Sequence, residues 1–142
     1  MIEQLSVFLQ NEPGKLVAIT RILADGGIDL RALSIADTSD FGVLRMLVSD
    51  TRKAKELLSA NNFVVGVTNV TVVPVPNVPG GLSQVLELLS NEDVNIEYMY
   101  SLIAHGDKQA YMVFRVADEE KLLQVLQENG LEVVPTEELG IR

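Results

Sequence analysis

The chain has 142 residues, no cysteine and a formal net charge of −9, from 11 Lys and Arg against 20 Asp and Glu. The lack of cysteine excludes disulfides, thiol catalysis and Cys-ligated zinc. The acidic balance argues against nucleic-acid and anionic-membrane surfaces, which need clustered positive charge. No apolar run approaches the roughly 20 residues of a membrane span, and the first residues do not resemble a secretory signal. We therefore expect a soluble, cytoplasmic protein that binds neither nucleic acid nor membranes.

The first half of the chain predicts the element order β-α-β-β-α-β. Alternating apolar and polar residues indicate strands, apolar residues three or four positions apart indicate amphipathic helices, and glycine is typical of a helix end. The predicted elements are a strand over 2–9, a helix over 15–25, hairpin strands over 28–37 and 41–48 around a turn at 38–40, a helix capped by Asp50 or Thr51, and a strand over 63–67.

The second half of the chain repeats this order. Asn11-Glu12-Pro13-Gly14 recurs as Asn77-Val78-Pro79-Gly80, an offset of 77 − 11 = 66 positions. After the second hairpin the offset is 118 − 50 = 68, so we infer two added residues at its tip, where insertions cost least. The repeated elements are a strand over 70–75, a helix with Leu82, Val85, Leu86 and Leu89 on one face, hairpin strands over 95–103 and 110–116 with residues 105–108 at the tip, a helix capped by Asp118, and a strand over 131–135.

This duplication predicts an α+β protein made of two tandem ferredoxin-like βαββαβ domains. The expected domains span residues 1–67 and 68–136, and residues 137–142 are expected to form a short exposed tail. A unit of about 66 residues is marginal on its own because it buries too little surface, so the two copies should pack on each other or on another chain. If they pack side by side, their antiparallel sheets, with helices on one face, could join into one eight-stranded sheet.

The Asn-x-Pro-Gly turn joins the first strand of each copy to its first helix. The N–H groups that follow are the unpaired donors of a helix start and lie at the positive end of the helix dipole, so the turn suits a carboxylate. Gly14 and Gly80 let a ligand approach the main chain closely, and the amides of Asn11 and Asn77 both donate and accept hydrogen bonds. The alternative is a purely structural turn, since these residues are common in turns.

The repeated element order, with Asn-x-Pro-Gly at this turn, resembles the ACT domain, a small ferredoxin-like regulatory module that usually binds amino acids. In that family the ligand typically lies between the Pro-Gly loop of one domain and the start of the second strand of a neighbouring domain. With the copies side by side, loop 11–16 would face 95–96, and loop 77–82 would face 28–30. The ligand-binding residues implied by the resemblance are Asn11, Pro13, Gly14, Lys15, Leu16, Ile28, Asp29 and Leu30 in the first copy, and Asn77, Pro79, Gly80, Gly81, Leu82, Val94, Asn95 and Ile96 in the second.

The two implied sites differ at the start of the second strand. Serine-binding members of the family often carry Asn followed by Ile or Val there, and Asn95-Ile96 matches this pattern, whereas the first copy has Asp29-Leu30. An Asp at this place would pair with an ammonium group and repel a carboxylate. We therefore expect the sites to differ in ligand or affinity, or one of them to be inactive. A small or aliphatic ligand side chain is suggested by Leu16, Leu82, Ile28 and Ile96.

The remaining polar residues predict no catalytic or metal site. His105 is the only histidine, and no second His or Cys exists to complete a metal site. The chain has neither a Walker loop nor a G-x-G-x-x-G motif, and no nucleophile with a positioned base, so we expect no enzyme activity and no cofactor. Arg45 and Arg115 lie in apolar strands, where they are either edge charges against aggregation or partners for acidic groups across an interface.

The function that these features favour is small-molecule sensing by an allosteric regulatory protein, with a free amino acid as ligand and a homodimer as the assembly. Two alternatives stay open. The chain is a non-catalytic regulatory subunit that docks on a metabolic enzyme without binding a ligand, or it is a dimerisation module. Exposed apolar residues on the open sheet face, such as Phe8 and Leu33, would favour either alternative.

Overall fold

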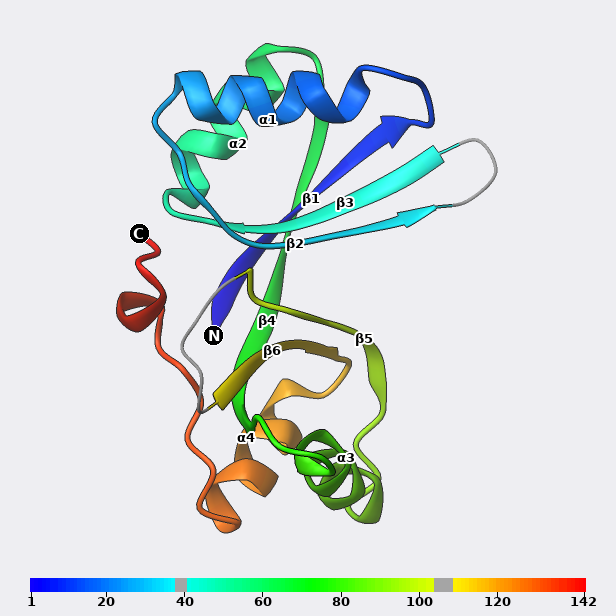
Figure 1. The fold of residues 1–142 in the computed structure, drawn as a ribbon, viewed down its shortest axis with the longest axis vertical. Helices are drawn as coiled ribbons and strands as arrows, with labels where there is room; N and C mark the ends of the chain where they lie inside the picture. The colour runs from blue at the N-terminus through cyan, green and yellow to red at the C-terminus, as the bar shows by residue number, and fades with distance from the viewer. Residues whose placement is uncertain (38–40, 104–108) are drawn as a thin grey trace. The chain divides into compact units, whose positions relative to one another are not determined.

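A computed structural model describes residues 1–37, 41–103 and 109–142 of the chain (Figure 1). The turns predicted at 38–40 and 105–108 lie outside these described residues, as does His105. The described elements are β1 (Ile2–Gln10), α1 (Lys15–Asp25), β2 (Leu30–Asp37), β3 (Phe41–Val48), α2 (Thr51–Ala60), β4 (Val64–Pro76), α3 (Gly81–Asn91), β5 (Ile96–Ser101), β6 (Gln109–Val116), α4 (Glu119–Glu128) and the 3₁₀ helix η1 (Thr136–Leu139).

The chain divides into two compact units. The N-terminal unit consists of Glu3–Asn69 together with Thr136–Arg142, and the C-terminal unit consists of Val70–Pro135 together with Met1–Ile2. Each unit therefore receives one short segment from the far end of the chain. The two units are described separately below.

The N-terminal unit packs α1 and α2 on one face of its strands β2, β3 and β1 (Figure 1). Both strand pairs that β3 makes, with β1 and with β2, are antiparallel. The alternation that predicts β1 explains the packing, because every second side chain of a strand points to the same face. The buried core joins both helices to the strands through Leu5, Val7, Leu9, Ile19, Leu23, Ile28, Leu44, Met46, Val48, Ala54 and Leu58.

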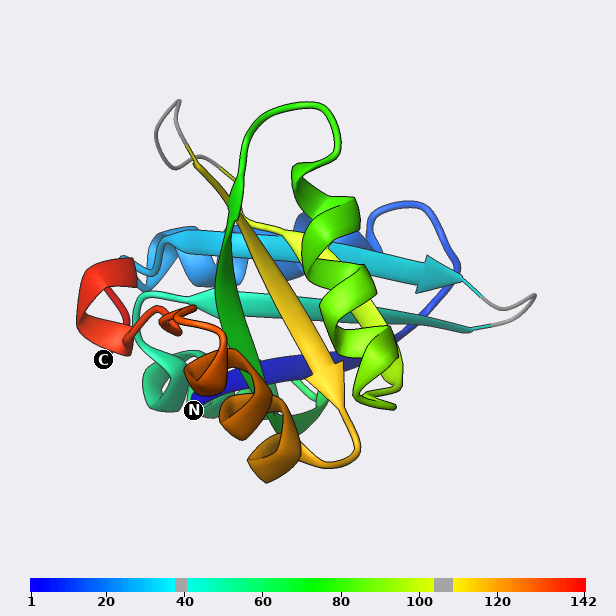
Figure 2. The ribbon, with the colours of Figure 1, turned by 90° about the horizontal axis from the view of Figure 1, so that it is seen from below.

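The C-terminal unit packs α3 and α4 on one face of β4, β6 and β5, as Figure 2 shows from below. Strand β6 pairs antiparallel with β4 on one side and β5 on the other. Its core consists of Val73, Val75, Val85, Leu89, Val94, Phe114, Val116, Leu122, Val125 and Leu126. The predicted helix residues Val85 and Leu89 thus face the strands, as an amphipathic helix requires.

The strand registers confirm the internal duplication. Leu5 pairs with Met46 in the N-terminal unit, and Thr71 pairs with Phe114 in the C-terminal unit, offsets of 71 − 5 = 66 and 114 − 46 = 68. The same offsets relate the pair Leu30 and Val48 to the pair Ile96 and Val116, and each of these pairs is followed by a register shift in its strand. The repeat therefore extends to a bulge at the matching residues Arg31 and Glu97.

The described residues form six strands rather than the eight expected, hydrogen-bonded in the order β2-β3-β1-β4 in the N-terminal unit and β4-β6-β5 in the C-terminal unit. The strands predicted over 63–67 and 70–75 form one strand, β4, because no Gly or Pro between them breaks the extended backbone. The strand predicted over 131–135 is irregular. In that segment the N–H of Val134 donates to the carbonyl of Val72 at 2.9 Å, and Pro135 has no N–H to extend a ladder.

The expectation of an exposed tail over 137–142 was wrong. Residues 136–139 form η1, and both Leu139 and Ile141 are buried, at 5% and 8% exposure. The N–H of Arg142 donates to the carbonyl of Ser49 at 2.9 Å. Two large aliphatic side chains in seven residues explain this packing, because their burial favours docking over solvation.

The two apolar residues expected on the open sheet face lie on different faces. Phe8 is exposed and pairs with Val43, and it points away from the core side chains of its neighbours Val7 and Leu9. Leu33 is also exposed, but it pairs with the core residue Met46 and so lies on the helix-covered face of β2. Its exposure follows from the position of β2 at the edge of the sheet, so the expectation for Leu33 was wrong.

Candidate functional site

The four α-helices begin in two different ways. Helices α2 and α4 begin after Asp50 and Asp118, whose carboxylates each accept a hydrogen bond at 3.1 Å from the N–H three residues on. Helices α1 and α3 begin after Gly14 and Gly80, which adopt φ of 88° and 83° and supply no side-chain cap. Helices α1 and α3 therefore lack the carboxylate cap that α2 and α4 have. The first N–H of each still donates within its turn, from Lys15 to the carbonyl of Glu12 at 3.4 Å and from Gly81 to the carbonyl of Val78 at 3.0 Å.

The difference in capping is measurable. Replacing either aspartate cap by alanine (Asp50→Ala or Asp118→Ala) is expected to lower the free energy of unfolding by ~1 kcal/mol, the usual value of such a cap. Urea denaturation measures this loss, and Asp25→Ala, at an exposed last residue of α1, serves as the control. A loss no larger than the control's would contradict the capping role.

Both turns are exposed to solvent. Asn11, Pro13, Gly14 and Leu16 are exposed and Lys15 is half-buried, while the carbonyl of Gly14 accepts from the N–H of Ala18 as a helix start should. In the second copy Asn77, Pro79 and Gly80 are exposed, Gly81 is buried and Leu82 packs partly against the core of its own unit.

Gly81 is buried for a steric reason. A Cβ built at this residue would lie 2.0 Å from the carbonyl oxygen of Pro76, nearer than any side chain allows. The matching residue of the first copy is Lys15, which carries a full side chain. The two turns share Pro and a left-handed Gly, but the second turn packs more tightly against the end of its strand.

At the start of β2 the structure places Ile28 in the core, Leu30 half-buried and Asp29 in solvent. The N–H of Asp29 donates to the Oγ of Ser49 at 2.9 Å, and the N–H of Ser49 donates to the carbonyl of Asp29 at 2.9 Å. The Asp29 carboxylate, with its side chain 79% exposed, lies 4.0 Å from the guanidinium of Arg31. An exposed carboxylate on a fixed backbone is available to an ammonium group.

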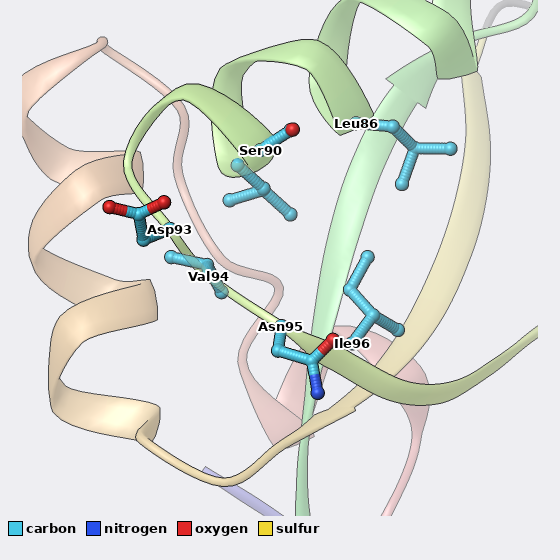
Figure 3. Close-up of a pocket in the computed structure, with 7 residues that line it drawn as sticks. Leu86, Ser90, Asp93, Val94, Asn95 and Ile96 are labelled. Carbon is cyan, nitrogen blue, oxygen red and sulfur yellow. The ribbon is translucent and has the colours of Figure 1, made fainter.

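In the second copy the strand start opens onto a hollow of about 390 Å³ (Figure 3). Val94, Asn95 and Ile96 line it together with Leu86, Leu89, Ser90 and Asp93 from α3 and the loop that follows. The lining of the hollow therefore combines aliphatic side chains with the hydroxyl of Ser90 on α3, the carboxylate of Asp93 and the amide of Asn95. Of the residues implied by the family resemblance, Val94, Asn95 and Ile96 line this cavity.

Asp93 holds an uncommon backbone conformation, with φ of 57°. The matching residue of the first copy, 66 positions earlier, is Gly27, with φ of 71°. The same left-handed conformation follows the C-cap of the other described α-helices, at Asn62 and Gly130 as well as Gly27, so at Asp93 it marks a helix end. Sequence reasoning missed Asp93 as a residue that lines the hollow. It also missed Ser49 and Arg31, which no local pattern distinguishes.

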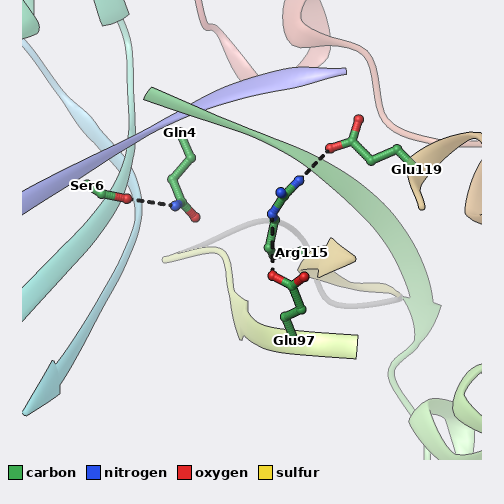
Figure 4. A network of polar contacts seen from close by, with 5 residues as sticks. All are labelled: Gln4, Ser6, Glu97, Arg115 and Glu119. Carbon is green, nitrogen blue, oxygen red and sulfur yellow. Dashed lines mark hydrogen bonds and ion pairs between the residues drawn. The ribbon is translucent and has the colours of Figure 1, made fainter. Parts of the chain in front are cut away.

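Arg115 has acidic partners within its own unit (Figure 4). Its guanidinium lies 3.7 Å from Glu97 and donates to Glu119 at 3.2 Å. Glu119 lies in the first turn of α4, where the helix dipole also favours a negative charge. In the N-terminal unit, the fully buried Gln4 donates to the Oγ of Ser6 at 3.2 Å. Both acidic partners of Arg115 lie within its own unit and β6 lies between β4 and β5, so these contacts match neither expected role, an edge charge or a partner across an interface.

Within the described ranges, no helix is long and apolar enough to cross a bilayer. Over the same ranges, no three His, Asp or Glu side chains gather into a group that could hold a metal ion. The expected pairing of each turn with the strand start of the other copy stays a prediction.

The β-α-β-β-α order that occurs twice, the matching registers and the two helix starts at a left-handed glycine define a tandem protein of ferredoxin-like domains. The family model of the ACT domain pair matches residues 1–141, and the chain belongs to this family. ACT domains are regulatory domains. The family resemblance drawn from the Asn-x-Pro-Gly turns is thereby confirmed.

Solved structures agree with this assignment. The protein BT0572 from Bacteroides thetaiotaomicron is 42% identical, with a TM-score of 0.91 over 98% of this chain and 95% of that one. The regulatory subunits of aspartate kinase from Thermus thermophilus and Thermus flavus are 15% and 16% identical, with TM-scores of 0.64 and 0.63. Both cover 89% of this chain, and 91% and 90% of those chains are covered in turn. At that identity the likeness shows the fold alone. Among curated proteins no match was found.

Proposed function

We propose that this chain is a non-catalytic cytoplasmic regulatory protein that binds a free amino acid at its Asn-x-Pro-Gly turns. The observation that supports this most directly is the contrast in helix capping. At the two turns a left-handed glycine gives its helix no side-chain cap, while the other helices begin under an aspartate of the chain itself. Membership of the ACT domain pair family, whose domains are regulatory, supports the same function.

In this proposal the α-carboxylate of the ligand accepts hydrogen bonds from first-turn N–H groups of α1 or α3 beyond Lys15 or Gly81, at the positive end of the helix. The polar groups of Asn11 or Asn77 lie beside it. The ammonium group meets a strand start, either the exposed carboxylate of Asp29 or the amide oxygen of Asn95. The half-buried Ile96 and Leu86 leave room for a small or aliphatic side chain.

Regulation requires that the ligand bind one arrangement of the protein more tightly than another. A ligand held by a turn from one domain and a strand start from another would stabilise the arrangement that brings them together, and so couple binding to assembly. The assembly that we propose is a homodimer, with a metabolic enzyme as the regulated partner. Two proteins of the same fold carry the name of regulatory subunits of aspartate kinase, which agrees with an enzyme partner.

The second candidate is a docking or dimerisation module without a ligand. Phe8 and Phe41, both exposed on the sheet face away from the helices, favour this candidate, since neighbouring apolar side chains in solvent mark interaction surfaces. Recovery of a metabolic enzyme from source lysate, with no amino acid bound, would favour the docking module over the sensor.

A thermal-shift screen with each of the twenty amino acids separates the two candidates. An amino acid at 100 times its Kd is expected to stabilise the protein by ~2.7 kcal/mol, because it binds the folded state alone. At the same ligand concentration, a 10- to 100-fold weaker affinity in the double variant Asp29→Asn with Asn95→Ala should reduce this stabilisation to ~0.4–1.4 kcal/mol. It should persist in full in Lys55→Ala, an exposed change on α2. If no amino acid raises the melting temperature of the wild-type protein, the sensing function is rejected.

A further inference from the structure

The C-terminal segment Thr136–Arg142 packs against the strand start that carries Asp29. We propose that this segment, here called the C-terminal strap, keeps the Asp29 site competent to bind, with Ser49 and Arg31 as positioning residues. The inference rests on the proposed function for the ligand, but its structural part concerns only contacts within the N-terminal unit.

Ser49 links the strap to the strand start through its three backbone and side-chain groups. Its Oγ accepts from the N–H of Asp29, its N–H donates to the carbonyl of Asp29, and its carbonyl accepts from the N–H of Arg142, all at 2.9 Å. The backbone that carries the Asp29 carboxylate is therefore held by the same residue that receives the strap. Releasing the strap frees the carbonyl of Ser49 and loosens the residue that fixes Asp29.

Arg31 makes the second link. Its Nη2 donates to the carbonyl of Gly140 at 3.4 Å and lies 4.0 Å from Oδ2 of Asp29. Gly140 adopts φ of 66°, and a Cβ there would lie 2.9 Å from this Nη2. The guanidinium of Arg31 thus contacts the backbone of the strap at Gly140, where no side chain intervenes. It lies close both to the carbonyl of Gly140 and to the carboxylate of Asp29. Without the strap carbonyl, the guanidinium is free to move onto Asp29 and compete with the ammonium group of a ligand for the carboxylate.

The second copy lacks both positioning residues. Glu97 stands where the first copy has Arg31, at the matching bulge, and Ala117 stands where it has Ser49. Glu97 pairs with Arg115 instead. The strap therefore acts on the Asp29 site and leaves the Asn95 site unaffected, so the two sites of one chain are not equivalent.

The strap is held in place by Leu139 and Ile141, both buried. Its attachment depends on the burial of two side chains and on few polar contacts, which is the pattern of a segment able to open without global unfolding. Opening and closing of the strap would then set the fraction of molecules whose Asp29 site is ready to bind.

The structural part is tested by hydrogen exchange without any ligand. Gly140→Val puts a side chain against Arg31 at a left-handed residue, and Gly130→Val is the control, because Gly130 has φ of 70° with nothing within 4 Å of its Cβ. We expect the amides of Asp29 and Ser49 to exchange about tenfold faster in Gly140→Val alone. If the strap amides exchange faster while those of Asp29 and Ser49 keep wild-type protection, the proposal is overturned.

The functional part uses Ser49→Ala, with Ser49→Thr as the conservative variant that keeps the hydroxyl. Titration calorimetry with the amino acids of the thermal-shift screen should show an affinity about tenfold weaker at one of two sites for Ser49→Ala, and wild-type affinity for Ser49→Thr. Equal loss at both sites would reduce Ser49 to a merely structural role and overturn the proposal. If no amino acid binds the wild-type protein, the sensing function fails, and hydrogen exchange alone still decides whether the strap holds the strand start.

Discussion

Gly81→Ala is expected to be the most damaging single methyl addition in the second turn. The added Cβ would lie 2.0 Å from the carbonyl oxygen of Pro76. The backbone fixes the position of a Cβ and the carbonyl is itself backbone, so neither group can rotate away. Because the start of α3 must move to admit the methyl, we expect the free energy of unfolding to fall by ~3 kcal/mol, at the upper end for overpacking. Urea denaturation of the wild-type and variant proteins measures the loss.

Gly66→Ala provides the matched control for this prediction. Gly66 lies within β4, and nothing stands within 4 Å of its Cβ. Its replacement should change stability by no more than ~0.5 kcal/mol, the usual range at an uncrowded surface position. If Gly81→Ala and Gly66→Ala change stability equally, the close approach of α3 to the end of β4 does not exist in solution. The second turn would then accept a side chain at residue 81, as the first turn does at the matching Lys15.

The second large effect is expected on ligand affinity. Asp29→Asn keeps the shape of the side chain and removes its charge, so an ammonium group loses a charge-assisted hydrogen bond that is roughly twice as strong as a neutral one. We expect the affinity of the Asp29 site to fall about 10- to 100-fold, which corresponds to ~1.4–2.8 kcal/mol. Titration calorimetry should show one of two binding events weakened and the other unchanged.

Asp25→Asn is the control for the charge itself. Asp25 is exposed at the end of α1, so this variant removes the same charge from the protein without touching a strand start. Both binding events should keep wild-type affinity. If Asp29→Asn binds as tightly as Asp25→Asn, the carboxylate takes no part in recognition, and the ammonium group must be placed elsewhere.

Local patterns were sufficient to predict most of the fold. The spacing of apolar residues placed all four helices and the two hairpins, because amphipathic periodicity depends on neighbours within a few residues. Asp118 was recognised as a cap, and Asp50 was one of two candidates with Thr51, for the same reason, since a cap bonds a backbone group three residues away. The duplicated turn led to the correct family.

Local patterns failed where a segment's state depends on a distant partner. The predicted breaks between residues 67 and 70 did not occur, and residues 131–135, with ordinary strand composition, form no ladder in the structure. Strand formation needs a partner edge in register, and the sequence of one segment does not say whether that edge is free.

By itself the sequence determined the duplication, the α+β class, the net negative charge and the two glycine turns. Composition, local spacing and a repeated motif establish these features, and none of them depends on a tertiary contact. Only the tertiary structure decided that Gly81 has no room for a side chain, that Asn95 opens onto a hollow, and that the last residues dock beside Asp29. The contacts responsible join residues far apart in the chain, 20 positions for Asp29 and Ser49 and 109 for Arg31 and Gly140. Such contacts exist only once the chain has closed those loops, and no local pattern records them.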